Sequence, residues 1–146
     1  MMTAFTWGDI DIKRNVTGPG DLAKGLVGIW ERLLKILVVE DEPLISLALK
    51  WELEDNGYDV ALAQDADCAI QLLETTDVDL IVTDVNMPGT MDGMELAFSV
   101  RDRWPPIKIV VMSGKHMPLP DHLPSQTVFI AKPFAPHQLT DLIAAF

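Results

Sequence analysis

The sequence contains a single cysteine, few basic residues and no long hydrophobic run. Cys68 has no second cysteine to pair with, which excludes an intrachain disulfide and suits a reducing cytoplasm. Lysine and arginine number 11 against 22 aspartates and glutamates. The formal net charge of -11 argues against direct nucleic-acid contact, because phosphate backbones select basic surfaces. No apolar run approaches the ~18 residues that cross a bilayer, and the N-terminus does not have the basic and apolar pattern expected of a secretory signal. We therefore expect a cytoplasmic protein without a membrane or nucleic-acid partner.

The remaining composition suits one globular domain preceded by an extension. Of the 146 residues, 49% are hydrophobic and 23% charged, enough to bury a domain core. Residues 1–34 are interpreted as an N-terminal extension and 35–146 as the domain. Within the extension, 21–34 has the apolar period of a helix, which either attaches loosely or serves docking or homodimerisation. The residues on this stripe are Leu22, Leu26, Ile29 and Leu33.

Short apolar runs alternate with helical patterns along the domain. This alternation predicts an α/β fold built from parallel strands and right-handed crossovers. The strands are expected at 35–39, 58–63, 80–82 with Asp84 at the end, 107–112 and 128–131. The helices are expected from Pro43 to Asn56-Gly57, from Asp65 to about Glu74, from about Met91 to Arg103, and after Pro133.

The first of these helices has an apolar stripe at helical spacing. We expect this stripe to face the core of the domain. Its members are Leu44, Leu47, Ala48 and Trp51.

Prolines interrupt the connection between the last two strands. Pro118, Pro120 and Pro124 are too closely spaced to lie inside a regular helix. The fourth helix should therefore be short, irregular or absent, and 115–126 largely non-helical.

Polar side chains of complementary chemistry stand at four predicted strand ends, where the carboxyl ends of parallel strands share one edge. Crowded carboxylates repel unless a cation lies among them, and hard oxygen ligands suit Mg²⁺. A lysine can meet an anion there, and a serine hydroxyl can contact it. This pattern indicates a phosphoryl site with Asp84 as the covalent acceptor, although Asp84 alone could simply begin a turn. The residues are Glu40, Asp41, Asp84, Ser113 and Lys132.

Together these motifs resemble a response-regulator receiver domain over about residues 35–146. The match rests on VVEDEP, TDVNMPG, MDGMEL, VVMSG and FIAKPF, in this order. The resemblance implies a doubly wound, flavodoxin-like sheet of five parallel strands in the order 2-1-3-4-5. It also implies two-component signalling, in which a histidine kinase or phosphotransfer protein donates the phosphoryl group. The domain would then lose the group by hydrolysis and have no further enzymatic activity.

The resemblance assigns the metal site and the acceptor. Asp84 matches the phosphorylated aspartate and Asp41 a direct Mg²⁺ ligand. Glu40, in place of the more usual aspartate, would hold a metal-bound water, and the backbone carbonyl of Asn86 would be a further ligand.

The resemblance also assigns the groups that contact the phosphoryl oxygens. Lys132 would bind these oxygens, and Ser113 would move toward them. Phe129 matches an aromatic rotamer switch, but it could equally be a plain core residue. The loop from Pro88 to Gly93 is one residue longer than the commonest loop of the family, which would widen the approach to the acceptor.

Because Phe146 follows directly on the last helix, we expect a stand-alone receiver that acts by contact with a downstream protein. One alternative is a degenerate receiver, a constitutive interaction module without phosphorylation. A second is an enzyme of the aspartyl-phosphatase type, which needs an acid two residues past the nucleophile, where this chain has Asn86.

Overall fold

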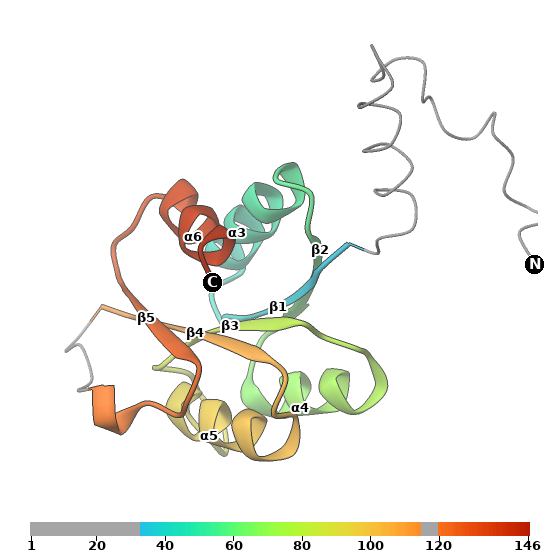
Figure 1. Cartoon of the computed structure of the whole chain (residues 1–146), viewed down its shortest axis with the longest axis vertical. Coiled ribbons are helices and arrows are strands. Elements are labelled where there is room, and N and C mark those ends of the chain that lie inside the picture. Colours follow the sequence, from blue (N-terminus) through green and yellow to red (C-terminus); the bar gives the residue numbers. More distant parts are fainter. Residues whose placement is uncertain (1–32, 115–119) are drawn as a thin grey trace, which may run out of the picture. The chain divides into compact units, whose positions relative to one another are not determined.

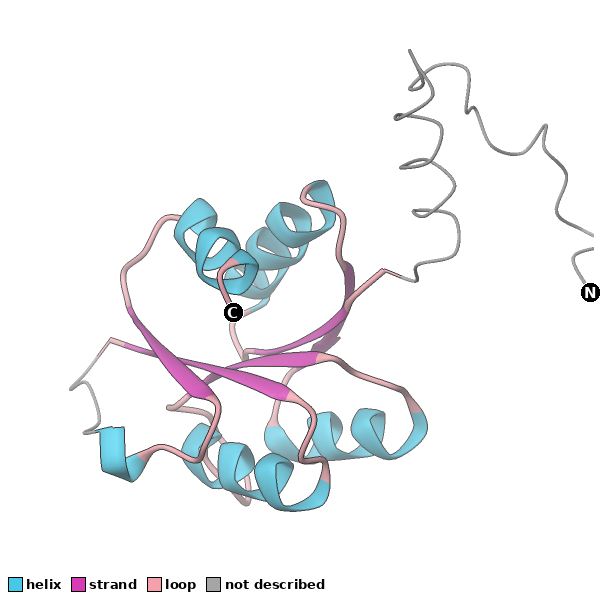
Figure 2. Ribbon diagram, in the orientation of Figure 1, coloured by secondary structure: helices cyan, strands magenta, loops and turns pink. Residues whose placement is uncertain are grey.

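Five strands and four α-helices alternate along the described part of this computed structural model, residues 33–114 and 120–146 (Figure 1, Figure 2). The predicted extension lies outside the described residues, except for Leu33 and Leu34, which are not helical. The strands are β1 (Lys35–Val39), β2 (Asp59–Ala63), β3 (Leu80–Asp84), β4 (Lys108–Ser113) and β5 (Thr127–Ala131). The helices are α3 (Pro43–Asp55), α4 (Ala66–Thr75), α5 (Gly93–Arg103) and α6 (Pro136–Ala144).

All strands are parallel and form one sheet in the order β2-β1-β3-β4-β5. Helices α3 and α6 cover one face of the sheet, and α4 and α5 cover the other (Figure 1). This confirms the predicted doubly wound fold. Because β1 and β3 are neighbours, with Val39 paired to Thr83, the residues that follow β1 lie beside the end of β3.

Side chains of the central strands alternate between two buried clusters. Leu37 and Ile81 point into the cluster that α4 and α5 complete. Ile36 and Val82 point into the cluster that α3 and α6 complete. Both faces of these strands are buried, which explains why they have continuous apolar runs.

Two helices begin at aspartate caps. The Asp65 carboxylate accepts the Cys68 backbone N–H at 2.8 Å, which lowers the pKa of Asp65. Asp92 accepts the Glu95 backbone N–H at 2.8 Å, so α5 begins at Gly93, two residues after the predicted start. No helix in the described ranges is long and apolar enough to cross a membrane.

The prediction of which side of α3 faces the core is wrong. Leu44 is 83% and Trp51 62% exposed, and Leu47 and Ala48 are exposed as well. The helix has a second apolar stripe that also fits the helical period, and this stripe packs against the sheet and α6. It contains Ile45, Leu49 and Leu53.

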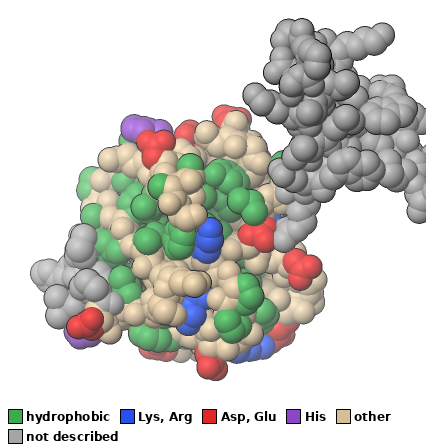
Figure 3. Space-filling model, in the orientation of Figure 1, with side chains coloured by type: hydrophobic (Ala, Val, Ile, Leu, Met, Phe, Trp, Pro, Cys, Tyr) green, Lys and Arg blue, Asp and Glu red, His purple; other side chains and the backbone are tan. Residues whose placement is uncertain are grey.

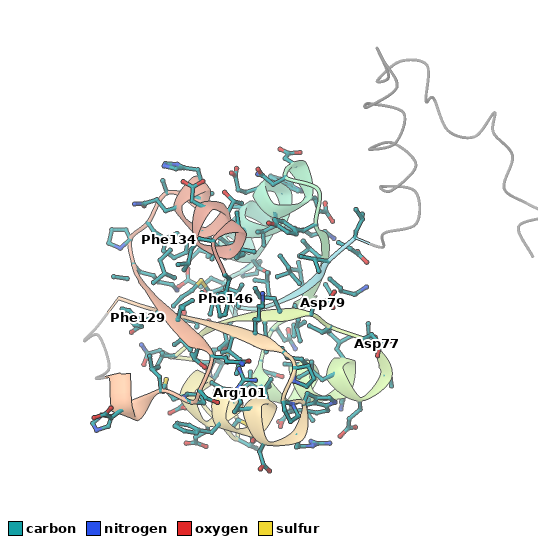
Figure 4. All side chains as sticks on the ribbon, in the orientation of Figure 1. Asp77, Asp79, Arg101, Phe129, Phe134 and Phe146 are labelled. Carbon is teal, nitrogen blue, oxygen red and sulfur yellow. The ribbon has the colours of Figure 1, made fainter. Side chains whose placement is uncertain are left out.

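The segment before β5 departs from a regular helix, as its prolines predict. Within its described part, 120–126, the helical structure is η2, a 3-10 turn over Pro120–His122, while 115–119 lies outside the described residues. Arg101 of α5 fastens the end of the segment (Figure 4). Its guanidinium donates to the backbone carbonyls of Ser125 at 2.7 Å and Gln126 at 3.1 Å. Hydrogen bonds from a neighbouring helix thus hold the entry into β5.

Candidate functional site

Two neighbouring strands bring three carboxylates to one edge of the sheet. Glu40 follows β1, and its backbone N–H donates to the Ala63 carbonyl at 3.0 Å, which continues the pairing with β2. Its side chain turns inward, leaving the residue 2% exposed, whereas Asp41 is exposed. Asp84 ends β3 and is 7% exposed. One oxygen from each of Glu40, Asp41 and Asp84 lies within 4.8 Å of the other two.

Lys132 joins these carboxylates from the end of β5. Its backbone N–H donates to the Ser113 carbonyl at 2.9 Å, which extends the β4–β5 pairing to the site. Its Nζ lies 2.6 Å from Asp84 Oδ2 and 3.5 Å from Glu40 Oε2. Burial lowers the pKa of Lys132, but the hydrogen bond and charge of Asp84, together with Glu40, outweigh this and raise it. Lys132 is therefore a fixed cation beside the Asp84 carboxylate.

Glu40 has an acceptor that the described residues do not satisfy. Its Oε1 is buried and accepts no hydrogen bond from the described part of the chain. Burial, followed by the hydrogen bond and charge of Asp84, raises the pKa of Glu40 to about 7 against the opposing effect of Lys132. A divalent cation would relieve this carboxylate crowding, and three hard oxygen donors are the ligand type that Mg²⁺ takes. The donor set fits Mg²⁺.

The loop after β3 holds Asp84 from the other side. The Asn86 backbone N–H donates to Asp84 Oδ1 at 3.1 Å, while the Asn86 side chain is exposed. At the far end of the loop, the Gly93 N–H donates to the Val85 carbonyl at 2.9 Å. A Cβ at Gly93 would lie 1.8 Å from the Asp84 carbonyl oxygen, so this close approach requires glycine.

The two predicted switch residues lie on neighbouring strands. Ser113 ends β4 and is buried, one residue beyond the partner of Asp84 in the β3–β4 register. Phe129 of β5 pairs with Val111 and is half-buried against the α4–α5 cluster (Figure 4). The structure thus brings Ser113 to the edge where Asp84 stands and leaves Phe129 two residues before the end of β5. A core residue and a rotating side chain are both compatible with that position.

Sequence reasoning missed a cleft beside the carboxylates and a hydrogen bond between the loop after β3 and helix α4. The cleft, of about 510 Å³, is bordered by Asp41, Ser46 and Cys68, among others. The bond joins the Thr90 hydroxyl to the Asp67 carboxylate oxygens, at 2.9 and 3.1 Å. Neither has a sequence signal, because each depends on elements that are distant along the chain.

Comparison with known proteins agrees with this geometry. The family model described as the response regulator receiver domain matches residues 36–144. Among characterised proteins, the chain is 34% identical over 114 residues to the alkaline phosphatase synthesis transcriptional regulatory protein PhoP of Bacillus subtilis. The alignment covers 76% of this chain and 47% of PhoP, so the chain spans about half the length of that relative.

Solved structures share the fold closely. Response regulator TrrA of Thermotoga maritima, in complex with Mg²⁺–BeF, is 27% identical with a TM-score of 0.68, covering 77% of this chain and 98% of TrrA. A response regulator receiver protein of Sinorhizobium medicae is 27% identical with a TM-score of 0.71, covering 78% of this chain and 94% of its own.

Proposed function

Because this chain belongs to the response-regulator receiver domain family, we propose that it accepts a phosphoryl group on Asp84 from a histidine kinase or phosphotransfer protein. The observation that supports this most directly is the position of the Asp84 carboxylate. It lies 2.6 Å from the Lys132 ammonium and beside the carboxylates of Glu40 and Asp41. Receiver domains are typically phosphoacceptors and not enzymes in their own right, which agrees with an acceptor aspartate that has no partner acid at Asn86.

The transfer would proceed by attack of an Asp84 carboxylate oxygen on the phosphorus of a phosphohistidine. The P–N bond breaks, an O–P bond forms, and the imidazole leaves with the electron pair. Lys132 then donates to the phosphoryl oxygens in place of the carboxylate, and the Ser113 hydroxyl moves toward them. Attack by water later releases inorganic phosphate and restores the carboxylate.

A Mg²⁺ ion would be held by Asp41, Asp84 and the backbone carbonyl of Asn86, with Glu40 bonded to one of its waters. When bound, the ion supplies positive charge to the phosphoryl oxygens during the transfer. In the same state, Glu40 is expected to be ionised, because the cation offsets the neighbouring carboxylate.

The outer face of α3 supports a protein as the phosphodonor. Leu44, Leu47 and Trp51 are exposed large hydrophobic side chains one helical turn or two apart. Hydrophobic side chains show at the surface of the layer formed by α3 and α6 (Figure 3). Because α3 begins three residues after Glu40, this apolar face adjoins the acceptor edge and favours contact with a partner protein. A downstream protein that distinguishes the phosphorylated state, and a cytoplasmic location, remain our predictions.

Phosphorylation by a small donor tests the proposal without the natural partner. Incubation with Mg²⁺ and acetyl phosphate should add one phosphoryl group per chain, observed by intact-mass spectrometry. Asp84→Asn should abolish the addition, and a chelator should suppress it in the unmodified protein. If the folded wild-type protein stays unlabelled, the alternative of a degenerate, constitutive interaction module is favoured.

The aspartyl-phosphatase alternative makes a different prediction. It requires turnover of phosphate monoesters much faster than hydrolysis of the acyl phosphate at Asp84. Asn86 cannot serve as a general acid, so we expect no such turnover.

A further inference from the structure

The loop from 85 to 92 is fastened at its base, beside the acceptor. The Gly93 N–H donates to the Val85 carbonyl at 2.9 Å, so the chain returns to the point where it left β3. Asn86, the second residue of the loop, donates its N–H to Asp84 Oδ1 at 3.1 Å. The position of the loop therefore fixes the backbone of Asn86 next to the Asp84 carboxylate.

The tip of this loop is fastened to a different element. The Thr90 hydroxyl donates to the Asp67 carboxylate, with its oxygen 2.9 Å from Oδ1 and 3.1 Å from Oδ2. Asp67 lies in the first turn of α4, which follows β2, whereas Thr90 follows β3. Since β1 lies between β2 and β3, the bond joins the two elements that flank the end of β1. Glu40 and Asp41 leave the sheet at that end.

We propose that Thr90 and Asp67 are positioning residues for the metal site, holding the loop so that the Asn86 carbonyl stays in place to bind Mg²⁺. This inference rests on the proposed function, because it assumes that Asp41, Asp84 and Asn86 hold the ion, with Glu40 bonded to one of its waters. The loop spans residues 85–92, and holding it in one conformation costs backbone entropy. A charge-assisted bond at its tip offsets that loss.

Removal of the hydroxyl donor tests this assignment. Thr90→Val keeps the shape of the side chain and should weaken Mg²⁺ binding to the unphosphorylated protein by roughly two- to tenfold, the range of a net hydrogen-bond contribution. Thr90→Ser retains the donor and should bind Mg²⁺ within about twofold of wild type. Titration calorimetry with MgCl₂ measures both.

Hydrogen exchange of the metal-free protein gives a second measurement. In Thr90→Val the amides of residues 85–92 should exchange faster than in wild type, while those of β1 and β3 keep their rates. Loop amides that exchange at the wild-type rate would show that the Thr90–Asp67 bond does not hold the loop in place.

A double-mutant cycle separates the effect of the Thr90–Asp67 hydrogen bond from the effect of the Asp67 charge on Mg²⁺ binding. Asp67→Ala removes a negative charge near the cation as well as the acceptor, so its effect alone is ambiguous. If the bond acts as proposed, Thr90→Val should weaken binding much less in the Asp67→Ala background than in wild type. Additive effects, or wild-type affinity in Thr90→Val, would overturn the proposal.

The outcome is distinguishable from failure of the proposed function. A wild-type protein that binds no Mg²⁺ and accepts no phosphoryl group would contradict both the proposed function and the positioning role of Thr90 and Asp67. If the wild-type protein binds Mg²⁺ and accepts a phosphoryl group, and Thr90→Val binds Mg²⁺ with wild-type affinity, only the role proposed for Thr90 and Asp67 is contradicted.

Discussion

At the scale of single residues, Glu40 combines deep burial with an ionisable carboxyl group. It is 2% exposed, its Oε1 is unsatisfied within the described chain, and its pKa is about 7. Desolvation of the carboxylate is the first cause of this rise, and the neighbouring Asp84 is the second. Ionisation of Glu40 therefore destabilises the site when no metal cation is bound, and a glutamine at this position would remove that cost.

Glu40→Gln should stabilise the metal-free protein near pH 8 by about 1–3 kcal/mol, since one pKa unit corresponds to 1.36 kcal/mol. Between the ordinary value of 4.5 and about 7, the folded protein holds a proton that the unfolded chain has released. Stability contributed by Glu40 is therefore complete below pH 4.5 and falls as the pH rises to about 7. Urea denaturation in the presence of a chelator, at about pH 8 and pH 4, measures the difference between variant and wild type.

The comparison at low pH is the control for this prediction. Near pH 4 the glutamate is protonated in both states, so the variant and the wild type should have nearly the same free energy of unfolding. An advantage of Glu40→Gln that persists unchanged at low pH would mean that packing, and not ionisation, is responsible.

At the scale of elements, the strands were predictable and the orientation of α3 was not. Each strand is a short apolar run bounded by turn residues, and that information is local. In α3 two apolar stripes fit the same helical period, and packing against β1, β2 and α6 decides which of them is buried. The sequence pattern alone could not choose between Leu47 and Leu49, because the choice depends on strands and a helix that lie outside α3.

The difference between local patterns and contacts between separate elements also explains which parts of the site were predictable. The end of β3 was identified from its apolar run and the turn at Pro88-Gly89, which placed Asp84 at the correct edge. The burial of the Glu40 side chain and the Thr90–Asp67 bond were not identified. Both arise where separate elements meet, so no local pattern could indicate them.

Leucine-to-alanine substitutions on the two faces of α3 should lower the free energy of unfolding by different amounts. Leu53→Ala removes a fully buried side chain and should cost about 2–5 kcal/mol of unfolding free energy. Leu44→Ala removes an 83% exposed side chain and should change stability by no more than about 0.5 kcal/mol. Both are leucine-to-alanine changes on one helix, so urea denaturation compares them directly. Equal losses would show that the outer stripe is covered in solution.

At the scale of the whole molecule, the formal net charge of -11 causes a general electrostatic repulsion. It adds to the local repulsion among the carboxylates of Glu40, Asp41 and Asp84. Any cation reduces the general repulsion by screening, whereas the acidic cluster at the ends of β1 and β3 needs a cation bound in place. A test of the metal site must therefore separate specific binding from ionic strength.

Mg²⁺ should stabilise the folded protein more than NaCl at the same ionic strength. A ligand that binds the folded state alone at a hundred times its Kd adds about 2.7 kcal/mol, which raises the Tm of a domain of this size by several degrees. Asp41→Asn removes one carboxylate of the cluster while the side chain is exposed, so the fold should persist and the Mg²⁺-specific rise should shrink. Thermal unfolding in matched salts measures both. An equal rise in MgCl₂ and NaCl would show that the three carboxylates respond only to screening.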